Sequence, residues 1–199
     1  MREPYHGDTI RVMGTWQTLF EVAIDRFGYL TPADAVTAGV DPVQLRILCH
    51  RGQLDRIDHG LYRMPMVPAT ELDQYAEMVL RTRRGVLSHV TALDLHELCD
   101  VNPALIHVTV PEGFRTRRQL PDVLKLHRAT LRPDEQTLHH GIPIVTPYRA
   151  IRDGIEARIG QHLIEQAIIN VTERGLVTLT ERGELVGIAA LLRENAGVR

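Results

Sequence analysis

The chain has 199 residues with a formal charge of −2, and 44% of its residues are hydrophobic. This composition is ordinary for a folded protein of one large or two small domains, and it excludes a polycation. No apolar run approaches the length of a membrane helix, and the first residues lack the apolar core of a secretory leader. We therefore expect a cytoplasmic protein without a membrane partner.

The basic residues are almost all arginine, because Lys125 is the only lysine among 23 Lys and Arg residues. The forked arginine guanidinium suits phosphate and guanine. In a near-neutral chain, DNA binding would require these arginines to be segregated onto one face.

The first predicted element is a helix over residues 16–26. Trp16, Leu19, Phe20 and Ala23 recur at three- and four-residue steps, which is typical of an amphipathic helix. We expect this helix to pack under the segment that follows it.

Residues 31–65 have the pattern of a winged helix-turn-helix. Thr31 is a suitable N-cap for a short helix that ends near Gly39, and Asp41 is a suitable N-cap for a second helix that ends at Gly52. The alternative is a small helical subdomain with an incidental hairpin, because helix-turn-helix shapes also serve as plain structural units.

The second short helix is the candidate recognition helix. Leu45, Leu48 and Cys49 form its inward stripe, and a rotation of about 100° per residue turns other side chains outward. A helix of this width fits the DNA major groove. The candidate DNA-contacting residues on and beside its outward face are Val43, Gln44, Arg46, Ile47, His50 and Arg51.

A hairpin is predicted next, with His59–Gly60 as its tight turn and Leu54 and Tyr62 among its apolar anchors. Phosphate contacts set the position and affinity of a DNA-binding protein, whereas base contacts set its sequence choice. The candidate phosphate contacts on this wing are Arg56, His59 and Arg63.

We expect a DNA-binding domain at residues 1–66 and a mixed second domain at residues 67–199. The second domain is predicted to contain helices and strands that do not alternate in a repeated parallel pattern, which favours an α+β protein over a doubly wound sheet. Its predicted strands span residues 106–110, 123–129 and 141–145. Its predicted helices begin at Thr70, Ser88, Thr146 and Thr180, and residues 163–171 are predicted to continue helical after the third of them.

Two arginine clusters lie in this second half. Arg81, Arg83 and Arg84 end the first predicted helix, where they either complement the helix dipole or contact DNA phosphate. The loop before the second strand is either a contact for nucleic acid or an acidic partner, or simply solvated. Its basic residues are Arg115, Arg117 and Arg118.

The sequence carries no signal for catalysis or for a cofactor. A Gly-rich phosphate loop, a nucleophile elbow and a kinase motif are all missing. His89, His96 and Cys99 could share a helix face, but a metal site needs converging ligands and usually a fourth from elsewhere. We interpret them as packing or hydrogen-bonding side chains and expect no bound metal. Cys49 and Cys99 are expected to be buried free thiols.

Three segments resemble the AbiEi-type antitoxins of type IV toxin–antitoxin systems, in their actinobacterial form. The first is GYLTPADAVTAGVDPVQLRILCHRGQLDRIDHGLYRMP, residues 28–65, which is similar to the winged helix of the family. The other two are similar to its second domain, namely GVLSHVTALDLHELCDVNPALIHVTVP at residues 85–111 and GIPIVTPYRAIRD at residues 141–153. The order and spacing of these segments are more specific than any one of them.

The resemblance implies a DNA-binding antitoxin that binds inverted repeats and represses its own operon. It also implies a cognate toxin of nucleotidyltransferase fold, which such antitoxins counter, often without a stable complex. Val43, Ile47 and Cys49 make this helix less basic than is usual in the family, which favours contacts with thymine methyl groups. The residues at recognition-helix and wing positions are Gln44, Arg46, Ile47, His50, Arg51, Arg56, His59 and Arg63.

Two other mechanisms of neutralisation stay open. One is an enzyme that modifies the toxin, for example by phosphorylation. The other is a module that binds the toxin directly through the second domain. Because no catalytic motif is present, we expect a protein that is not an enzyme.

Overall fold

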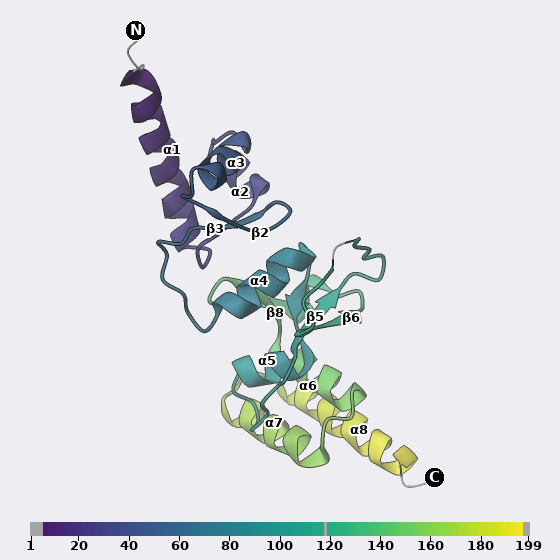
Figure 1. The fold of residues 1–199 in the computed structure, drawn as a ribbon. Coiled ribbons are helices and arrows are strands. Elements are labelled where there is room, and N and C mark those ends of the chain that lie inside the picture. The colour runs from purple at the N-terminus through teal and green to yellow at the C-terminus, as the bar shows by residue number, and fades with distance from the viewer. Residues whose placement is uncertain (1–5, 118, 197–199) are drawn as a thin grey trace. The chain divides into compact units, whose positions relative to one another are not determined.

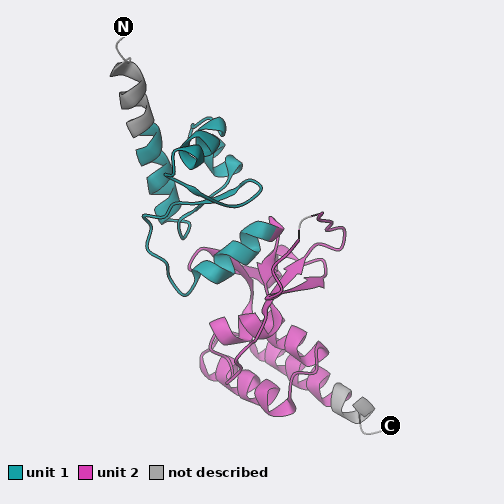
Figure 2. Ribbon diagram, in the orientation of Figure 1, with its two compact units in different colours: residues 1–81 teal, residues 82–199 magenta. Residues whose placement is uncertain are grey.

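The computed structural model describes residues 6–117 and 119–196. The chain divides into two compact units, which we call unit 1 (residues 1–81) and unit 2 (residues 82–199) (Figure 2). In the described ranges, no helix combines the length and apolar character needed to cross a membrane.

The boundary between the two units falls at the end of helix α4 (Asp73–Thr82). The sequence suggested a boundary after residue 66, where prolines follow the wing. The structure instead groups almost all of α4 with unit 1. Asp73, Glu77 and Arg81 of this helix make polar contacts with the winged helix.

Unit 1 has the element order of a winged helix-turn-helix, with α1, α2 and α3 grouped beside a β-hairpin (Figure 1). Its small sheet is antiparallel and has the order β1-β3-β2. The two-residue strand β1 was not predicted from the sequence. Before α4, the elements are α1 (His6–Ile24), β1 (Tyr29–Leu30), α2 (Pro32–Thr37), α3 (Val43–His50), β2 (Asp55–Asp58) and β3 (Leu61–Arg63).

Side-chain caps fix where the short helices begin. Thr31 and Asp34 form a reciprocal capping box, in which the Asp34 amide donates to Thr31 Oγ1 and the Thr31 amide donates to Asp34 Oδ2 at 2.8 Å. Thr31 is therefore confirmed as an N-cap. Pro42, rather than Asp41, occupies the N-cap position of α3, but the Asp41 carboxylate accepts from the Val43 amide at 2.9 Å. Both helix starts are thus set by local chemistry.

The hydrophobic core of unit 1 is formed by side chains from its helices and from its sheet. Leu19 and Ala23 of α1 and Leu45 and Leu48 of α3 are fully buried, and Tyr62 of β3 packs in the same cluster. Each large apolar side chain buried in this way stabilises the fold by about 1.5–3 kcal/mol. The inward stripe of α3 therefore holds the helix firmly and leaves its opposite face outward.

Unit 2 is built on a mixed sheet with the strand order β6-β5-β4-β8-β7. The pairs β5–β6 and β4–β8 are parallel, and the remaining pairs are antiparallel. This arrangement confirms the predicted α+β class. The elements are β4 (Val86–Leu87), α5 (His89–Leu95), β5 (Ile106–Val110), β6 (Leu124–Arg128), η1 (Pro133–Glu135), β7 (Gln136–His139), β8 (Ile142–Val145), α6 (Pro147–Glu156), α7 (Gln161–Glu173) and α8 (Leu179–Ala196).

Strands β4 and β7 were not predicted from the sequence. Strand β4 has two residues, which is too short for a periodic signal. Strand β7 is an edge strand whose side chains are mostly exposed, so it lacks the apolar alternation that marks a half-buried strand.

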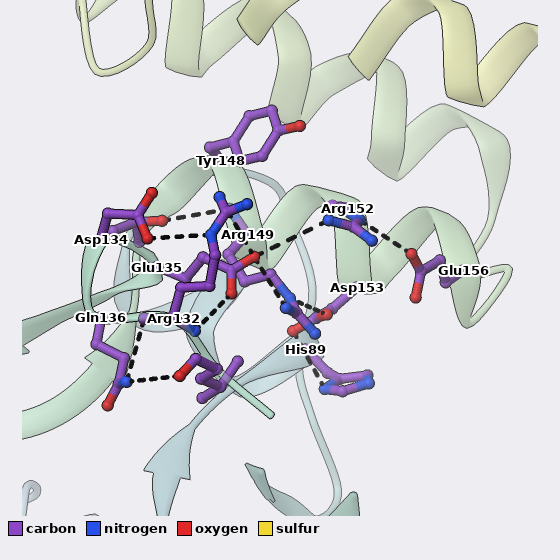
Figure 3. A network of polar contacts seen from close by, with 12 residues as sticks. His89, Arg132, Asp134, Glu135, Gln136, Tyr148, Arg149, Arg152, Asp153 and Glu156 are labelled. Atoms are coloured by element: carbon purple, nitrogen blue, oxygen red, sulfur yellow. Dashed lines mark hydrogen bonds and ion pairs between the residues drawn. The ribbon is translucent and has the colours of Figure 1, made fainter. Parts of the chain in front are cut away.

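A buried ionic network ties α6 to the turn before β7 (Figure 3). Arg149 donates to Asp153 Oδ1 at 2.7 Å and to Glu135 Oε1 at 3.0 Å. Glu135 also accepts from the backbone amide of Arg132 at 2.9 Å. Burial raises the pKa of Glu135, but the hydrogen bonds from Arg132 and Arg149 outweigh it and leave this pKa below its ordinary value. Glu135 is therefore held as a carboxylate.

Candidate nucleic-acid interface

The outward face of α3 is the centre of the candidate interface. Val43, Arg46 and His50 are exposed, whereas Gln44 and Ile47 are half-buried at its margins. Cys49 is also half-buried, so the expectation of a buried thiol holds for Cys99 and is wrong for Cys49.

Two arginines of this face are free to meet a ligand. Arg46 and Arg51 are exposed, and neither forms an ion pair with a described residue. Arg51 is the C-cap of α3, and Gly52 follows it with φ of 70°, a conformation that glycine adopts readily. The chain therefore turns away directly after Arg51.

The wing carries a second exposed basic group. Arg56 and His59 are exposed, and Arg56 Nη2 lies 3.4 Å from His59 Nδ1. Gly60 completes the turn with φ of 71°, and a register shift between Arg56 and Asp58 makes β2 irregular. Both basic side chains thus lie at the turn end of the hairpin.

Arg63 has an internal role that the sequence did not reveal. Its guanidinium donates to Asp73 Oδ2 at 2.7 Å and to the Val67 carbonyl at 3.3 Å, and its side chain is only 18% exposed. It also lies over the Tyr29 ring at 5.8 Å. We therefore do not retain Arg63 as a phosphate contact.

Arg81 is also paired with carboxylates inside unit 1. It donates to Glu77 Oε1 at 2.7 Å and to Asp58 Oδ2 at 3.1 Å, and its side chain is 14% exposed. The Tyr29 hydroxyl adds a hydrogen bond to Glu77 at 2.9 Å. Arg81 is thus a link between α4 and the wing, and we remove it from the interface as well.

The other arginine candidates lie in unit 2. Arg83, Arg84, Arg115 and Arg117 are exposed. Arg118 lies outside the described residues. These arginines belong to unit 2, whereas α3 and the wing belong to unit 1.

The structure also gathers three histidines that the sequence did not connect. His89 at the start of α5, His107 on β5 and His127 on β6 place their ligand atoms within 4.8 Å of one another. His107 Nδ1 and His127 Nε2 are 3.1 Å apart. In the sequence, each of these two strands carries one histidine on its more polar face. The sequence did not reveal that the two strands pair and bring the two histidines together.

The suggested face of His89, His96 and Cys99 does not form a cluster. His96 donates from Nε2 to the Val145 carbonyl at 2.8 Å and lies edge-on to His139. Burial lowers the pKa of His96, which suits a neutral ring that donates to a carbonyl. His89 instead faces His107 and His127.

Unit 1 is therefore a winged helix-turn-helix with an exposed, partly basic helix and a basic wing. Residues 17–65 match the family described as "Transcriptional regulator, AbiEi antitoxin". The match covers the end of α1, the helices α2 and α3, and the wing. It supports a role as an antitoxin and transcriptional regulator.

A solved structure shares the fold over most of the chain. The crystal structure of the RV2827C protein from Mycobacterium tuberculosis is similar with a TM-score of 0.52 and 18% sequence identity. The similarity covers 94% of this chain and 73% of that chain. At this identity the likeness concerns the fold alone. None of the curated proteins matches the chain.

Proposed function

We propose that this chain is an antitoxin that represses its own operon by inserting α3 into the major groove of operator DNA. The observation that carries the proposal is the pair Arg46 and Arg51, which are exposed and not neutralised by a described carboxylate. They stand on a helix whose inward side is fixed by Leu45 and Leu48.

The residues of α3 suit a mixed readout of DNA. Arg46 offers a forked donor for guanine or phosphate, while exposed Val43 and half-buried Ile47 offer methyl groups for thymine. The wing residues Arg56 and His59 would contact phosphate and fix the docking angle. No bond is made or broken in this mode of action.

The small number of exposed basic side chains on the described surface of α3 and the wing limits the footprint of this surface. With a net charge of −2, the protein gains little from non-specific attraction to DNA. Binding to inverted repeats would present two copies of α3 on one face of the duplex, with half-sites separated by about one helical turn. We therefore expect affinity to depend on paired half-sites.

The test of the interface is a double substitution. Arg46→Ala with Arg51→Ala should weaken binding to the DNA upstream of the operon by at least about tenfold, since each lost base or phosphate contact costs about 1–3 kcal/mol. Fluorescence anisotropy at one fixed salt concentration measures this. A matched control replaces two exposed arginines of unit 2, Arg128 and Arg182, with alanine.

The two double variants distinguish the outcomes. If the control pair weakens binding as much as the α3 pair, general charge rather than α3 is responsible. If the α3 pair binds with unchanged affinity, the assigned face is wrong. Circular dichroism of both variants establishes that each is folded.

We also propose that the chain counters a nucleotidyltransferase-type toxin, with unit 2 carrying that activity. The support is that unit 2 has its own sheet and core, separate from the helix and wing. The α3 double variant should lose repression but still protect cells that co-express the toxin. Co-purification would indicate a direct complex, and a mass change on the toxin would indicate a modifying enzyme.

A further inference from the structure

We propose that His89, His107 and His127 form a binding site for one zinc ion in unit 2. The inference does not depend on DNA binding, because all three side chains belong to unit 2. The three imidazoles come from three different elements, which is the arrangement that lets ligands converge on one point.

The register of the sheet brings two of the ligands together. Strands β5 and β6 are parallel, with His107 opposite Lys125 and Thr109 opposite His127. Because alternate residues of a strand share a face, His107 and His127 lie diagonally on the same face of the sheet. Helix α5 begins beside this face and supplies His89.

The distance between the first two ligand atoms fits a zinc ion. His107 Nδ1 and His127 Nε2 are 3.1 Å apart. Two nitrogens at about 2.0–2.1 Å from a tetrahedral zinc ion are about 3.4 Å apart. A small outward movement of these two rings would therefore admit the metal between them in place of their present hydrogen bond.

His89 needs a larger adjustment. Its ring stacks on that of His127 with centroids 3.5 Å apart and planes at 18°. Lone pairs of parallel rings do not converge, so His89 must tilt out of the stack to coordinate the same ion. Its backbone already has φ of 53°, a conformation that non-glycine residues adopt rarely and that is concentrated at functional sites.

Asp153 provides a carboxylate behind His89 (Figure 3). Its Oδ2 lies 3.6 Å from His89 Nδ1 and is a buried oxygen without a hydrogen-bond partner in the described structure. The other oxygen is held by Arg149 at 2.7 Å. His89 Nδ1 contacts Ser88 Oγ at 3.0 Å, and Asp153 Oδ2 lies behind this contact at 3.6 Å. With zinc on Nε2 of His89, a small rotation of the ring would let Nδ1 donate to Asp153, as metal-bound histidines commonly do to a carboxylate.

Neutral imidazole is the commonest metal ligand in proteins, and each of the three rings has a nitrogen whose lone pair can bind a cation.

The three imidazole ligands favour some metal ions over others. Three imidazoles without a thiolate suit zinc and other late first-row ions rather than Mg²⁺ or Ca²⁺, which prefer oxygen ligands. Three protein nitrogens leave a fourth tetrahedral position for water or another small ligand. The proposed ion would link the start of α5 to β5 and β6.

The test titrates the full chain with zinc after treatment with a chelator. Isothermal titration calorimetry should give about one zinc ion per chain with micromolar or tighter affinity. His107→Gln with His127→Gln should abolish this binding. His162→Gln is the matched control, because His162 is exposed and lies outside the cluster. Binding that persists in the double variant, or the loss of binding in the control, would overturn the assignment.

NMR of the wild-type protein provides a second test that does not depend on whether a variant folds. Zinc should shift the imidazole NMR signals of three histidines and leave those of the others in place. Co²⁺ should give the visible absorption of a low-coordinate site. Asp153→Asn should weaken affinity by roughly 10- to 100-fold while keeping the stoichiometry. No imidazole shift on zinc addition would refute the proposal.

Discussion

The Arg63 guanidinium lies 2.7 Å from the Asp73 carboxylate, and this contact joins strand β3 of the wing to the first residue of α4. Asp73 also accepts from the amide and the hydroxyl of Thr70, at 3.0 and 2.7 Å. One carboxylate therefore caps a helix and neutralises an arginine that would otherwise extend the basic wing. This pairing is one reason that the candidate DNA surface is smaller than the sequence suggested.

Asp73→Ala should destabilise unit 1 by about 2 kcal/mol, because it leaves the half-buried Arg63 without its partner and the amide and hydroxyl of Thr70 without their acceptor. Urea unfolding followed by circular dichroism measures the change. The control is Glu71→Ala, since Glu71 is exposed. Equal unfolding midpoints for the two variants would show that the contact contributes nothing.

The same pair predicts a pH dependence. Burial raises the pKa of Asp73, but the hydrogen bonds from Thr70 and Arg63 outweigh it and leave this pKa below 3.8. A lowered pKa means that the stabilisation is complete above the unfolded-state value and is lost as the pH falls through the folded-state value. The difference in free energy of unfolding between the wild type and Asp73→Asn should therefore be constant near neutral pH and shrink under strongly acidic conditions. A difference that grows on acidification contradicts the assignment.

Glu135→Ala should cost unit 2 about 3 kcal/mol. Glu135 is 4% exposed, and its removal leaves the buried Arg149 guanidinium with one carboxylate fewer. Asp134→Ala is a control from the adjacent position, because the Arg132–Asp134 pair is mostly exposed and should contribute less than about 1 kcal/mol. Thermal unfolding of the two variants compares them. A similar loss of stability in the two variants would show that the buried network does not specifically stabilise unit 2.

Gly85→Ala should destabilise unit 2 by about 1–3 kcal/mol through overpacking. An added Cβ would collide with the Thr82 side chain and lie 2.5 Å from Val108 Cγ1. Gly183→Ala is the matched control, because its Cβ would meet open space within helix α8 and alanine favours a helix. The melting temperature should fall for the first variant and stay or rise for the second. The opposite order would contradict the packing shown for β4 and β5.

Arg56→Ala should reduce the salt dependence of operator binding. A lost phosphate contact lowers the slope of log affinity against log salt by about 0.9. Val43→Ala should leave that slope unchanged and alter the preference among operator sequences, because an exposed valine contacts bases rather than phosphate. Anisotropy titrations at several salt concentrations separate the two effects. An unchanged slope for Arg56→Ala would exclude it from the phosphate contacts.

Local features of unit 1 were readable from the sequence because they depend on neighbours along the chain. The capping box of Thr31 and Asp34, the buried stripe of Leu45 and Leu48, and the turn at Gly60 all follow from residues within a few positions. The Thr31 cap and the hairpin were therefore predicted correctly. The predicted bounds of the first helix, 16–26, were wrong, because α1 spans His6–Ile24, and the N-cap of α3 is Pro42 rather than Asp41. The strands β4 and β7 were missed because a short strand and an exposed edge strand carry little periodic signal.

The sequence by itself determined the helix-turn-helix pattern, the wing and the α+β class. Only the tertiary structure decided which charges are free. Arg63 and Arg81 look like Arg46 and Arg56 in sequence, but Arg63 pairs with Asp73 of α4, and Arg81 pairs with Glu77 of its own helix and with Asp58 of β2. His107 and His127 meet because parallel strands align residues far apart in the chain. Such pairings depend on strand register and on helix docking, which are set by the packing of the whole unit rather than by any local run of residues.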